Sequence, residues 1–263
     1  MRVAAVQMVS TPVVQENLAA ASGLIAQAAA GGAQLVLLPE YFCLMGHSDT
    51  DKIGVRESEE GPIQAFLAEQ ARLHGIWLVG GTVPLACDDP GKVYNTTQVY
   101  GPDGAHCARY DKIHLFSFRR GAEAYDEAVT ILPGRTPAVF DAPCGRVGLS
   151  ICYDLRFPEL YRAMHEPALI LVPAAFTYTT GRAHWEVLLR ARAIENQCYV
   201  LAAAQGGVHP NGRRTWGHSM LIDPWGDILE LREEGAGVVA GTVEPSRIEQ
   251  VRTDLPALRH RVM

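Results

Sequence analysis

Three residues that can perform acyl-transfer chemistry each follow a run that reads as a β-strand. Glu40 follows "QLVLLP", Lys112 follows "ARYD", and Cys152 follows "VGLSI". In α/β proteins, functional side chains gather just beyond the carboxyl ends of strands. We therefore expect these three side chains to meet at one site. Each also has a simpler interpretation: a solvated carboxylate, a surface lysine and a buried thiol.

The chemistry that these residues predict is nucleophilic attack on an amide. A cysteine attacks only as the thiolate, so Cys152 needs a base or a nearby positive charge. Glu40, in a pocket poor in water, would have a raised pKa and would take the thiol proton. Lys112 and the backbone N–H of Tyr153 would then stabilise the oxyanion that forms at the amide carbon.

The remainder of the chain alternates strands with helices. Apolar residues recur at helical spacing through residues 14–28, and continuous apolar runs such as "QLVLLP" follow them. The segments "KVYNTTQVY" and "AHCARY" flank "GPDG" and predict an antiparallel hairpin. This order occurs twice, in residues 1–110 and 145–243, within a single domain of residues 1–263. Periodicity leaves two α/β architectures open, a four-layer sandwich and one doubly wound sheet.

Composition excludes several classes of protein. The 263 residues are 48% hydrophobic and carry a formal charge of −6, with basic residues scattered along the chain, so we expect no nucleic-acid partner. No apolar stretch reaches the roughly 18 residues that a membrane span needs, and the N-terminus lacks signal-peptide features. Six widely spaced cysteines without C-x-x-C predict reduced thiols. These observations indicate a cytoplasmic protein that does not bind membranes.

The histidines leave one alternative mechanism open. None of the nine forms an H-x-x-x-H or H-E-x-x-H spacing, so we expect no metal site. A cysteine–histidine hydrolase, with His114 or His218 as the base, is the alternative to a glutamate base.

Three segments of the chain are similar to those of a known family. "LLPEYF", "YDKIHLF" and "GLSICYDLRFPEL" resemble the catalytic segments of the nitrilase superfamily, carbon–nitrogen hydrolases with a Glu-Lys-Cys triad. The resemblance implies the four-layer α-β-β-α sandwich and no cofactor, with Glu40 as base, Lys112 as oxyanion stabiliser and Cys152 as nucleophile. It also implies a second glutamate that positions the lysine, and Glu127 in "YDEAVTILPG" matches that glutamate better than Glu123 does.

Further segments narrow the resemblance to the Nit-type amidases. "CYDLRFPEL" and "GHSMLIDPWG" look like theirs, which implies a small-molecule amide substrate. The candidates are deaminated glutathione, an α-keto acid amide-linked to Cys-Gly, and α-ketoglutaramate. Arg156, four residues past the nucleophile, would bind the keto-acid carboxylate bidentately, unless it pairs with Asp154 or Glu159. Phe176 and Thr180 match positions that line the acyl pocket, although Phe176 also suits core packing.

The resemblance extends to assembly. Superfamily members are commonly dimers joined by a helix near the nucleophile, so we expect a homodimer. Other members hydrolyse nitriles, carbamoyl groups or simple amides, and a non-catalytic scaffold with the same fold is a further alternative.

Overall fold

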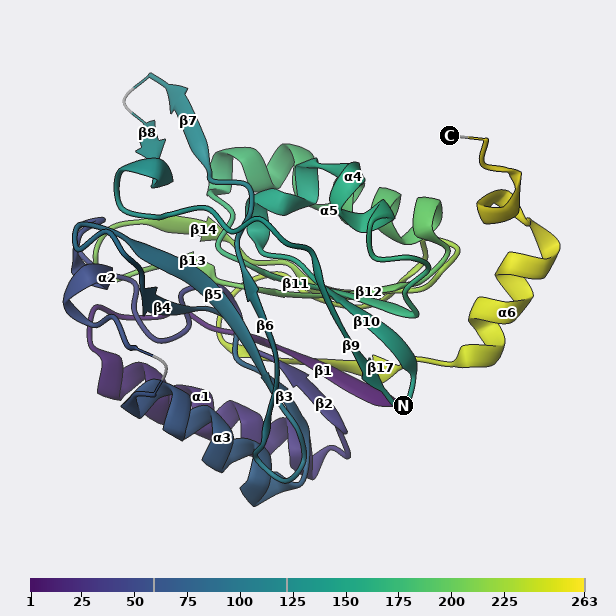
Figure 1. The fold of residues 1–263 in the computed structure, drawn as a ribbon, viewed down its shortest axis with the longest axis horizontal. Helices are drawn as coiled ribbons and strands as arrows, with labels where there is room; N and C mark the ends of the chain where they lie inside the picture. Colours follow the sequence, from purple (N-terminus) through teal and green to yellow (C-terminus); the bar gives the residue numbers. More distant parts are fainter. Residues whose placement is uncertain (59, 122, 263) are drawn as a thin grey trace.

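Two β-sheets pack face to face in a computed structural model that describes residues 1–58, 60–121 and 123–262 (Figure 1). The first sheet contains β1 (Arg2–Gln7), β2 (Leu35–Leu37), β3 (Trp77–Val79), β4 (Val83–Ala86), β5 (Val93–Tyr100), β6 (His106–Asp111) and β17 (Gly237–Thr242). Its order is β17-β1-β2-β3-β5-β4, and β6 pairs with β5. Strands β1, β2 and β3 are mutually parallel, as the helical crossovers between them require.

The second sheet has a similar arrangement. It contains β9 (Ala138–Ala142), β10 (Gly145–Leu149), β11 (Leu169–Ala174), β12 (Tyr199–Ala204), β15 (Ser219–Ile222) and β16 (Ile228–Arg232). The order is β16-β15-β12-β11-β10-β9, with β10, β11 and β12 parallel. The two halves of the chain thus build one sheet each, except that β17 returns to pair with β1.

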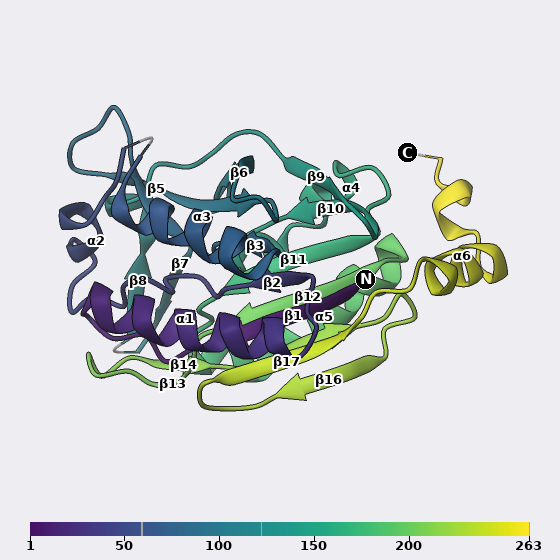
Figure 2. The ribbon, with the colours of Figure 1, turned by 90° about the horizontal axis from the view of Figure 1, so that it is seen from below.

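Helices cover the outer face of each sheet. The helices are α1 (Val14–Ala30), α2 (Asp51–Gly54), α3 (Pro62–His74), α4 (Pro158–Arg162), α5 (Tyr178–Asn196) and α6 (Pro245–Asp254). Figure 2 shows α1 and α3 side by side across the first sheet, while α4 and α5 lie on the far side of the second sheet in Figure 1. The predicted four-layer sandwich is confirmed. Among the described residues, no helix is long and apolar enough to cross a membrane.

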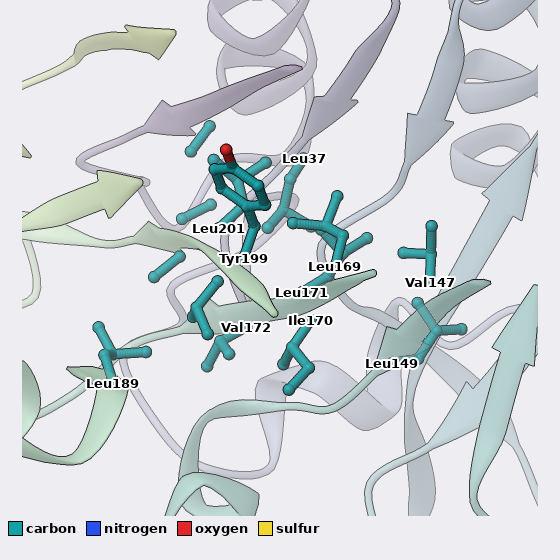
Figure 3. Packing of buried hydrophobic residues seen from close by; sticks show 14 of the residues in the cluster. Leu37, Val147, Leu149, Leu169, Ile170, Leu171, Val172, Leu189, Tyr199 and Leu201 are labelled. Carbon is teal, nitrogen blue, oxygen red and sulfur yellow. The ribbon is translucent and has the colours of Figure 1, made fainter. Parts of the chain in front are cut away.

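The two apolar cores follow from this layering. Ile25 of α1 and Leu67 of α3 pack with Val36 of β2 on the outer face of the first sheet. Leu37, the next residue along β2, points to the opposite face and joins the larger core that includes Leu171 of the second sheet (Figure 3). Because adjacent residues of a strand face opposite sides, a strand buried on both faces needs a continuous apolar run. Burying each such side chain contributes about 1.5–3 kcal/mol.

Two short hairpins and α2 stand outside the sheets at one end of the sandwich (Figure 1). The hairpins are β7 (Ser117–Arg120) with β8 (Glu123–Asp126), and β13 (Gly206–Val208) with β14 (Arg214–Trp216). Three 3₁₀ helices cover Glu127–Val129, Cys152–Arg156 and Ala257–His260. Neither hairpin was predicted from the sequence, and both border a cavity at Cys152.

Candidate active site

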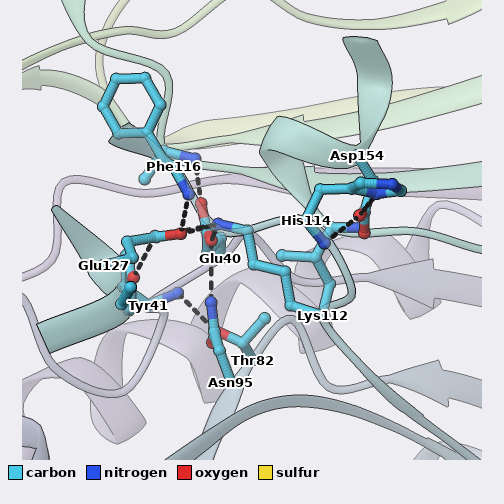
Figure 4. Close-up of polar contacts among 12 residues, drawn as sticks. Glu40, Tyr41, Thr82, Asn95, Lys112, His114, Phe116, Glu127 and Asp154 are labelled. Atoms are coloured by element: carbon cyan, nitrogen blue, oxygen red, sulfur yellow. Dashed lines mark hydrogen bonds and ion pairs between the residues drawn. The ribbon is translucent and has the colours of Figure 1, made fainter. Parts of the chain in front are cut away.

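A lysine and two glutamates form a buried charged cluster (Figure 4). The Lys112 Nζ lies 2.9 Å from Glu40 Oε1 and 2.8 Å from Glu127 Oε2. The side chains of Lys112 and Glu40 are fully buried, and that of Glu127 is 13% exposed. Hydrogen-bonded ion pairs are the means by which charges are retained in a desolvated volume. The structure thus brings together three of the four residues predicted to be catalytic.

Glu40 connects the two sheets. It lies three residues after the end of β2, and its Oε1 accepts a hydrogen bond from the Asn95 Nδ2 of β5 at 2.9 Å. Its Oε2 accepts one from the backbone N–H of Ala175, which directly follows β11, also at 2.9 Å. Both oxygens are therefore oriented by donors from different sheets, and the carboxylate has little rotational freedom.

Glu127 is held by a separate set of donors. It begins the 3₁₀ helix that follows β8, and its Oε1 accepts a hydrogen bond from the Tyr41 hydroxyl at 2.8 Å. Its Oε2 accepts one from the backbone N–H of Phe116 at 2.7 Å. Together with Lys112, these contacts leave both carboxylate oxygens paired. The loop that carries Glu127 is thereby fixed to the end of β2.

The pKa values of the two glutamates shift in opposite directions. Burial raises the pKa of Glu40 above its ordinary value; attraction to Lys112 opposes this shift, while the nearby Glu127 charge adds to it. Burial would also raise the pKa of Glu127, but Lys112 and the hydrogen bonds outweigh it, so that pKa is lowered. Burial alone would lower the pKa of Lys112, yet the two carboxylates hold it well above its ordinary value. Glu40 is therefore the carboxylate better suited to accept a proton.

Cys152 starts the 3₁₀ helix that follows β10, in a left-handed conformation with φ +50°. Tyr41, adjacent to Glu40, is also left-handed, with φ +57°. For residues other than glycine, each such conformation costs on the order of 1–3 kcal/mol. Burial raises the pKa of the Cys152 thiol well above its ordinary value, and the negative charge of Glu40 and a hydrogen bond to it act in the same direction. The thiol therefore stays protonated until a base removes its proton.

Asp154 connects the nucleophile turn to the segment that carries Lys112. Its Oδ2 accepts hydrogen bonds from the Ile151 backbone N–H at 2.9 Å and from the Tyr110 hydroxyl at 2.8 Å. Its Oδ1 lies 3.0 Å from the backbone N and 2.7 Å from the Nδ1 of His114 (Figure 4). The fully buried Asp154 carboxylate thus fixes the position of the turn relative to Lys112, which lies between Tyr110 and His114 in sequence.

The two histidines considered as alternative bases have other partners. His114 contacts Asp154, and its ring stacks on that of Phe157 with centroids 3.7 Å apart. The His218 Nδ1 lies 2.9 Å from the Trp216 carbonyl oxygen. Of the residues that the structure describes, neither histidine lines the cavities around the thiol, so the geometry does not favour a histidine base. Within the same ranges, no three His, Cys, Asp or Glu side chains are grouped to hold a metal ion.

Two cavities meet at Cys152. The lining of the first includes Glu40, Tyr41, Asp49, Lys52, Tyr125, Asp126, Glu127, Cys152, Arg213 and Arg214. The second is lined by Phe116, Cys152, Tyr153, Arg156, Ala175, Phe176, Thr177 and Thr180. The first cavity is therefore lined by several charged side chains, including both glutamates, and the second is mostly apolar with one guanidinium. This second cavity brings together the three residues predicted to bind the acyl group.

Arg156 lies in the second cavity without a carboxylate partner among the described residues. Its Nη1 is 3.1 Å from the His184 Nδ1, and its guanidinium lies 5.3 Å from the centroid of the Phe176 ring. Among the described residues, no ion pair joins Arg156 to Asp154 or Glu159, so the alternative pairing is not observed. The guanidinium therefore retains donors for an anionic ligand.

Phe176 and Thr180 have structural contacts as well as a place in the cavity. The Phe176 ring lies 4.7 Å from that of Trp185, so the core-packing interpretation also describes this side chain. The Thr180 Oγ1 lies 2.9 Å from the Thr177 Oγ1, at the start of α5. Both residues are thus held rigidly where they border the cavity.

The chain is similar in sequence to proteins of a known family. A family model described as "Carbon-nitrogen hydrolase" matches residues 2–253. The chain belongs to the carbon–nitrogen hydrolase family. This hydrolase is 43% identical over 265 residues to the deaminated glutathione amidase of Synechocystis sp. (strain PCC 6803 / GT-S), covering 98% of this chain and 97% of the relative. It is 37% identical over 269 residues to the omega-amidase NIT2 of Xenopus tropicalis, covering 99% and 94% respectively.

The same likeness holds among solved structures. The NitFhit protein of C. elegans superimposes with a TM-score of 0.91 at 37% identity, covering 99% of this chain. The carbon–nitrogen hydrolase described here spans 65% of the length of that protein. The predicted superfamily and its sandwich fold are confirmed.

The structure adds residues that the sequence analysis did not select. Asn95 and Tyr41 orient the two glutamates of the hydrolase, and Asp154 orients the nucleophile turn. Lys52 and Arg213 border the first cavity from two distant segments. The sequence offers a signal for Tyr41 and Asp154, which adjoin the motifs, and for Lys52, because the chain has only three lysines.

Proposed function

We propose that this carbon–nitrogen hydrolase is an amidase that hydrolyses the amide bond of deaminated glutathione through a cysteine thioester, releasing α-ketoglutarate and Cys-Gly. The observation that carries the proposal is that Glu40 and Glu127, both paired with the buried Lys112, line the same cavity as Cys152. The similarity to a deaminated glutathione amidase supports the choice of substrate.

In the acylation step, Glu40 takes the proton of the Cys152 thiol, and the sulfur forms a bond to the γ-carbonyl carbon. The carbonyl oxygen becomes an oxyanion that the Lys112 ammonium and the Tyr153 N–H stabilise. Tyr153 is the second residue of a 3₁₀ helix, so its N–H has no acceptor within that helix. The carbon–nitrogen bond then breaks, and the proton on Glu40 passes to the leaving nitrogen.

In the deacylation step, Glu40 takes a proton from water, and the hydroxide adds to the thioester carbon. The carbon–sulfur bond breaks, the acid is released, and the proton on Glu40 passes to the Cys152 thiolate. The raised pKa of Glu40 suits the abstraction of protons from the thiol and from water, because a carboxylate of higher pKa is the stronger base. Glu127, with its lowered pKa, stays ionised and positions Lys112.

The second cavity suits an acyl chain that ends in a carboxylate. Phe176 and Thr180 form apolar and polar walls, and the guanidinium of Arg156, which has no carboxylate partner among the described residues, provides the fork geometry that a carboxylate requires. The α-keto acid end of deaminated glutathione has this chemistry. An α-ketoglutaramate substrate presents the same acyl group, so the resemblance to an omega-amidase makes that activity the second candidate.

The test is kcat/KM for deaminated glutathione beside α-ketoglutaramate, with the wild type and Cys152→Ala in parallel. We expect a preference of tenfold or more for the glutathione derivative, about 1.4 kcal/mol in transition-state stabilisation, and no turnover by the variant. A preference for α-ketoglutaramate would instead establish an ω-amidase. Activity that persists in Cys152→Ala would refute the thioester mechanism.

We also propose that the enzyme is a homodimer that works in the reducing cytoplasm. Apolar side chains on and beside α5 support the dimer, since Val187, Ile194 and Trp225 are 67%, 48% and 53% exposed. All six cysteines are free thiols, which suits a reducing compartment. Light scattering that detects only a 28.6 kDa species would contradict the dimer.

A further inference from the structure

The first cavity contains cations that the proposed reaction does not use. Lys52 enters it from α2, and Arg213 and Arg214 enter it from the hairpin of β13 and β14. Their segments are far apart in the sequence, and each lies outside the two sheets (Figure 1). The proposed chemistry at Cys152 requires only Lys112 as a cation, so these three have no assigned role.

Lys52 has unused hydrogen-bonding capacity. Its ammonium donates to the Thr130 Oγ1 at 3.1 Å and lies 5.8 Å from the centroid of the Tyr41 ring. Among the described residues, no carboxylate lies within ion-pair distance of its Nζ. An ammonium has three donors, so two remain for a ligand. Burial lowers the pKa of Lys52, and the charges of Asp49 and Glu127 only partly oppose this shift.

Arg213 is the second cation with capacity to bind a ligand. Its guanidinium lies 5.2 Å from the centroid of the Tyr125 ring and 3.6 Å from the Asp49 Oδ1, a loose contact. Arg214, by contrast, pairs with Glu234 at 3.3 Å and lies only 3.7 Å from the centroid of the Tyr178 ring. Lys52 and Arg213 are therefore the cations best placed to bind an anion inside the cavity.

The positions of the glutamates determine which part of the substrate enters this cavity. The leaving nitrogen must receive a proton as the carbon–nitrogen bond breaks, and Glu40 is the proposed donor. Glu40 and Glu127 line the first cavity, whereas neither lines the second. The acyl group thus occupies the second cavity, beside Arg156, and the leaving group extends into the first.

We propose that Lys52 and Arg213 bind the terminal carboxylate of a peptide-like leaving group, an assignment that rests on the proposed amidase function. In deaminated glutathione this group is the glycine carboxylate. Two residues in extended conformation span at most about 7 Å, so this carboxylate lies one short peptide away from the scissile bond. The leaving group of α-ketoglutaramate is ammonia, which has no carboxylate for Lys52 and Arg213 to bind. The two cations therefore determine the preference between these substrates.

The test uses three α-ketoglutaryl amides that differ only in the leaving group: Cys-Gly, Cys-glycinamide and ammonia. The variants are Lys52→Met, Lys52→Arg and Arg213→Met. The control is Arg72→Met, an exposed arginine on α3 whose guanidinium pairs with Glu69 at 2.8 Å. Thermal melts establish that each variant is folded. Steady-state kinetics give kcat/KM for every pair of enzyme and substrate.

We expect the wild type to prefer the Cys-Gly amide to its glycinamide by tenfold or more. Lys52→Met and Arg213→Met each remove most of this preference, and they leave the glycinamide and α-ketoglutaramate rates within about threefold of the wild type, a change of under 1 kcal/mol. Lys52→Arg, which keeps the charge, retains most of the preference, and Arg72→Met retains all of it.

Other results overturn the inference in distinguishable ways. Equal wild-type rates for the Cys-Gly amide and its glycinamide would refute carboxylate binding while leaving the amidase function intact. An equal loss on all three substrates in Lys52→Met and Arg213→Met would show that the cations support the fold or Glu127 rather than the leaving group. A wild type that hydrolyses only α-ketoglutaramate would overturn both this inference and the proposed function.

Discussion

Replacing Glu127 by Gln tests the charged cluster most directly. The substitution keeps the shape of the side chain and removes one negative charge next to Lys112. It also replaces one acceptor oxygen by an NH₂ group. The two oxygens of Glu127 accept hydrogen bonds from the Tyr41 hydroxyl, the Phe116 N–H and the Lys112 ammonium. In either amide orientation, the NH₂ group therefore faces at least one donor.

The structure sets the size of the effect. A buried donor left without an acceptor costs about 1–3 kcal/mol of stability, less than the roughly 5–15 kcal/mol that holds a protein folded. Lys112 then pairs with Glu40 alone and is less well positioned for the oxyanion. Loss of one oxyanion donor typically costs about 10²–10³ in kcat. We expect a decrease in that range from a folded enzyme.

The same variant has a second consequence for Glu40. The Glu127 charge helps to raise the pKa of Glu40, so its removal lowers that pKa. Glu40 then becomes a weaker base, and the acid limb of the pH profile moves to lower pH. A substitution that only disturbed the loop would reduce the rate without moving this limb.

The assay is the pH dependence of kcat/KM for Glu127→Gln beside Glu123→Gln. Glu123 is a matched control, because it lies four residues before Glu127, in β8, and its Oε1 accepts a hydrogen bond from the Thr179 hydroxyl at 3.1 Å. We expect the kcat/KM of Glu123→Gln to remain within about threefold of the wild-type value, which corresponds to less than about 1 kcal/mol in transition-state stabilisation. A decrease of under tenfold in Glu127→Gln, or an equal decrease in Glu123→Gln, would refute the reasoning.

Three further predictions address the base, the nucleophile turn and the packing. Because Glu40 must be ionised to act and its pKa is raised, wild-type kcat/KM should fall as pH drops through a value above the ordinary 4.5; a profile still flat at pH 4.5 would contradict a glutamate base. Asp154→Asn should lose about 1–3 kcal/mol in urea unfolding, because in either orientation its amide NH₂ faces a backbone N–H, that of His114 or that of Ile151; unchanged stability would argue against this network. In Gly181→Ala the new Cβ clashes with the Trp216 Cβ, so overpacking should cost about 1–3 kcal/mol in the same assay. In the control Gly23→Ala, on α1, the new Cβ has no atom within 4 Å, so the variant should gain about 0.5–1 kcal/mol of stability. Equal effects of the two substitutions on stability would show that the space around the new Cβ does not explain them.

Much of the fold was predictable because local sequence reports burial. The run "QLVLLP" predicts a strand buried on both faces, and β2 has this environment in the structure. Helical spacing in residues 14–28 likewise marks the face that α1 places on the first sheet. The hairpin of β7 and β8 was not predicted, since its strands "SFRR" and "EAYD" are charged, largely exposed and have little of the apolar alternation that identifies a strand.

The sequence by itself determined which residue types are available and where each strand ends. Glu40, Lys112 and Cys152 were recognisable because each follows a strand, and motif similarity singled out Glu127. Tertiary structure alone decided which donors orient them, such as Asn95 for the Glu40 carboxylate. It also brought Lys52 and Arg213 to the cavity of Cys152.

The physical reason is the range of the interactions. Periodicity reports which face of an element leaves water, and that face is set by residues close together in the chain. The site depends on contacts between segments separated by tens of residues, and these form only when both sheets and their hairpins pack together. Short polar segments such as α2 and the β13–β14 hairpin lack the apolar periodicity that reports burial, so only the packed chain places their charges beside the nucleophile.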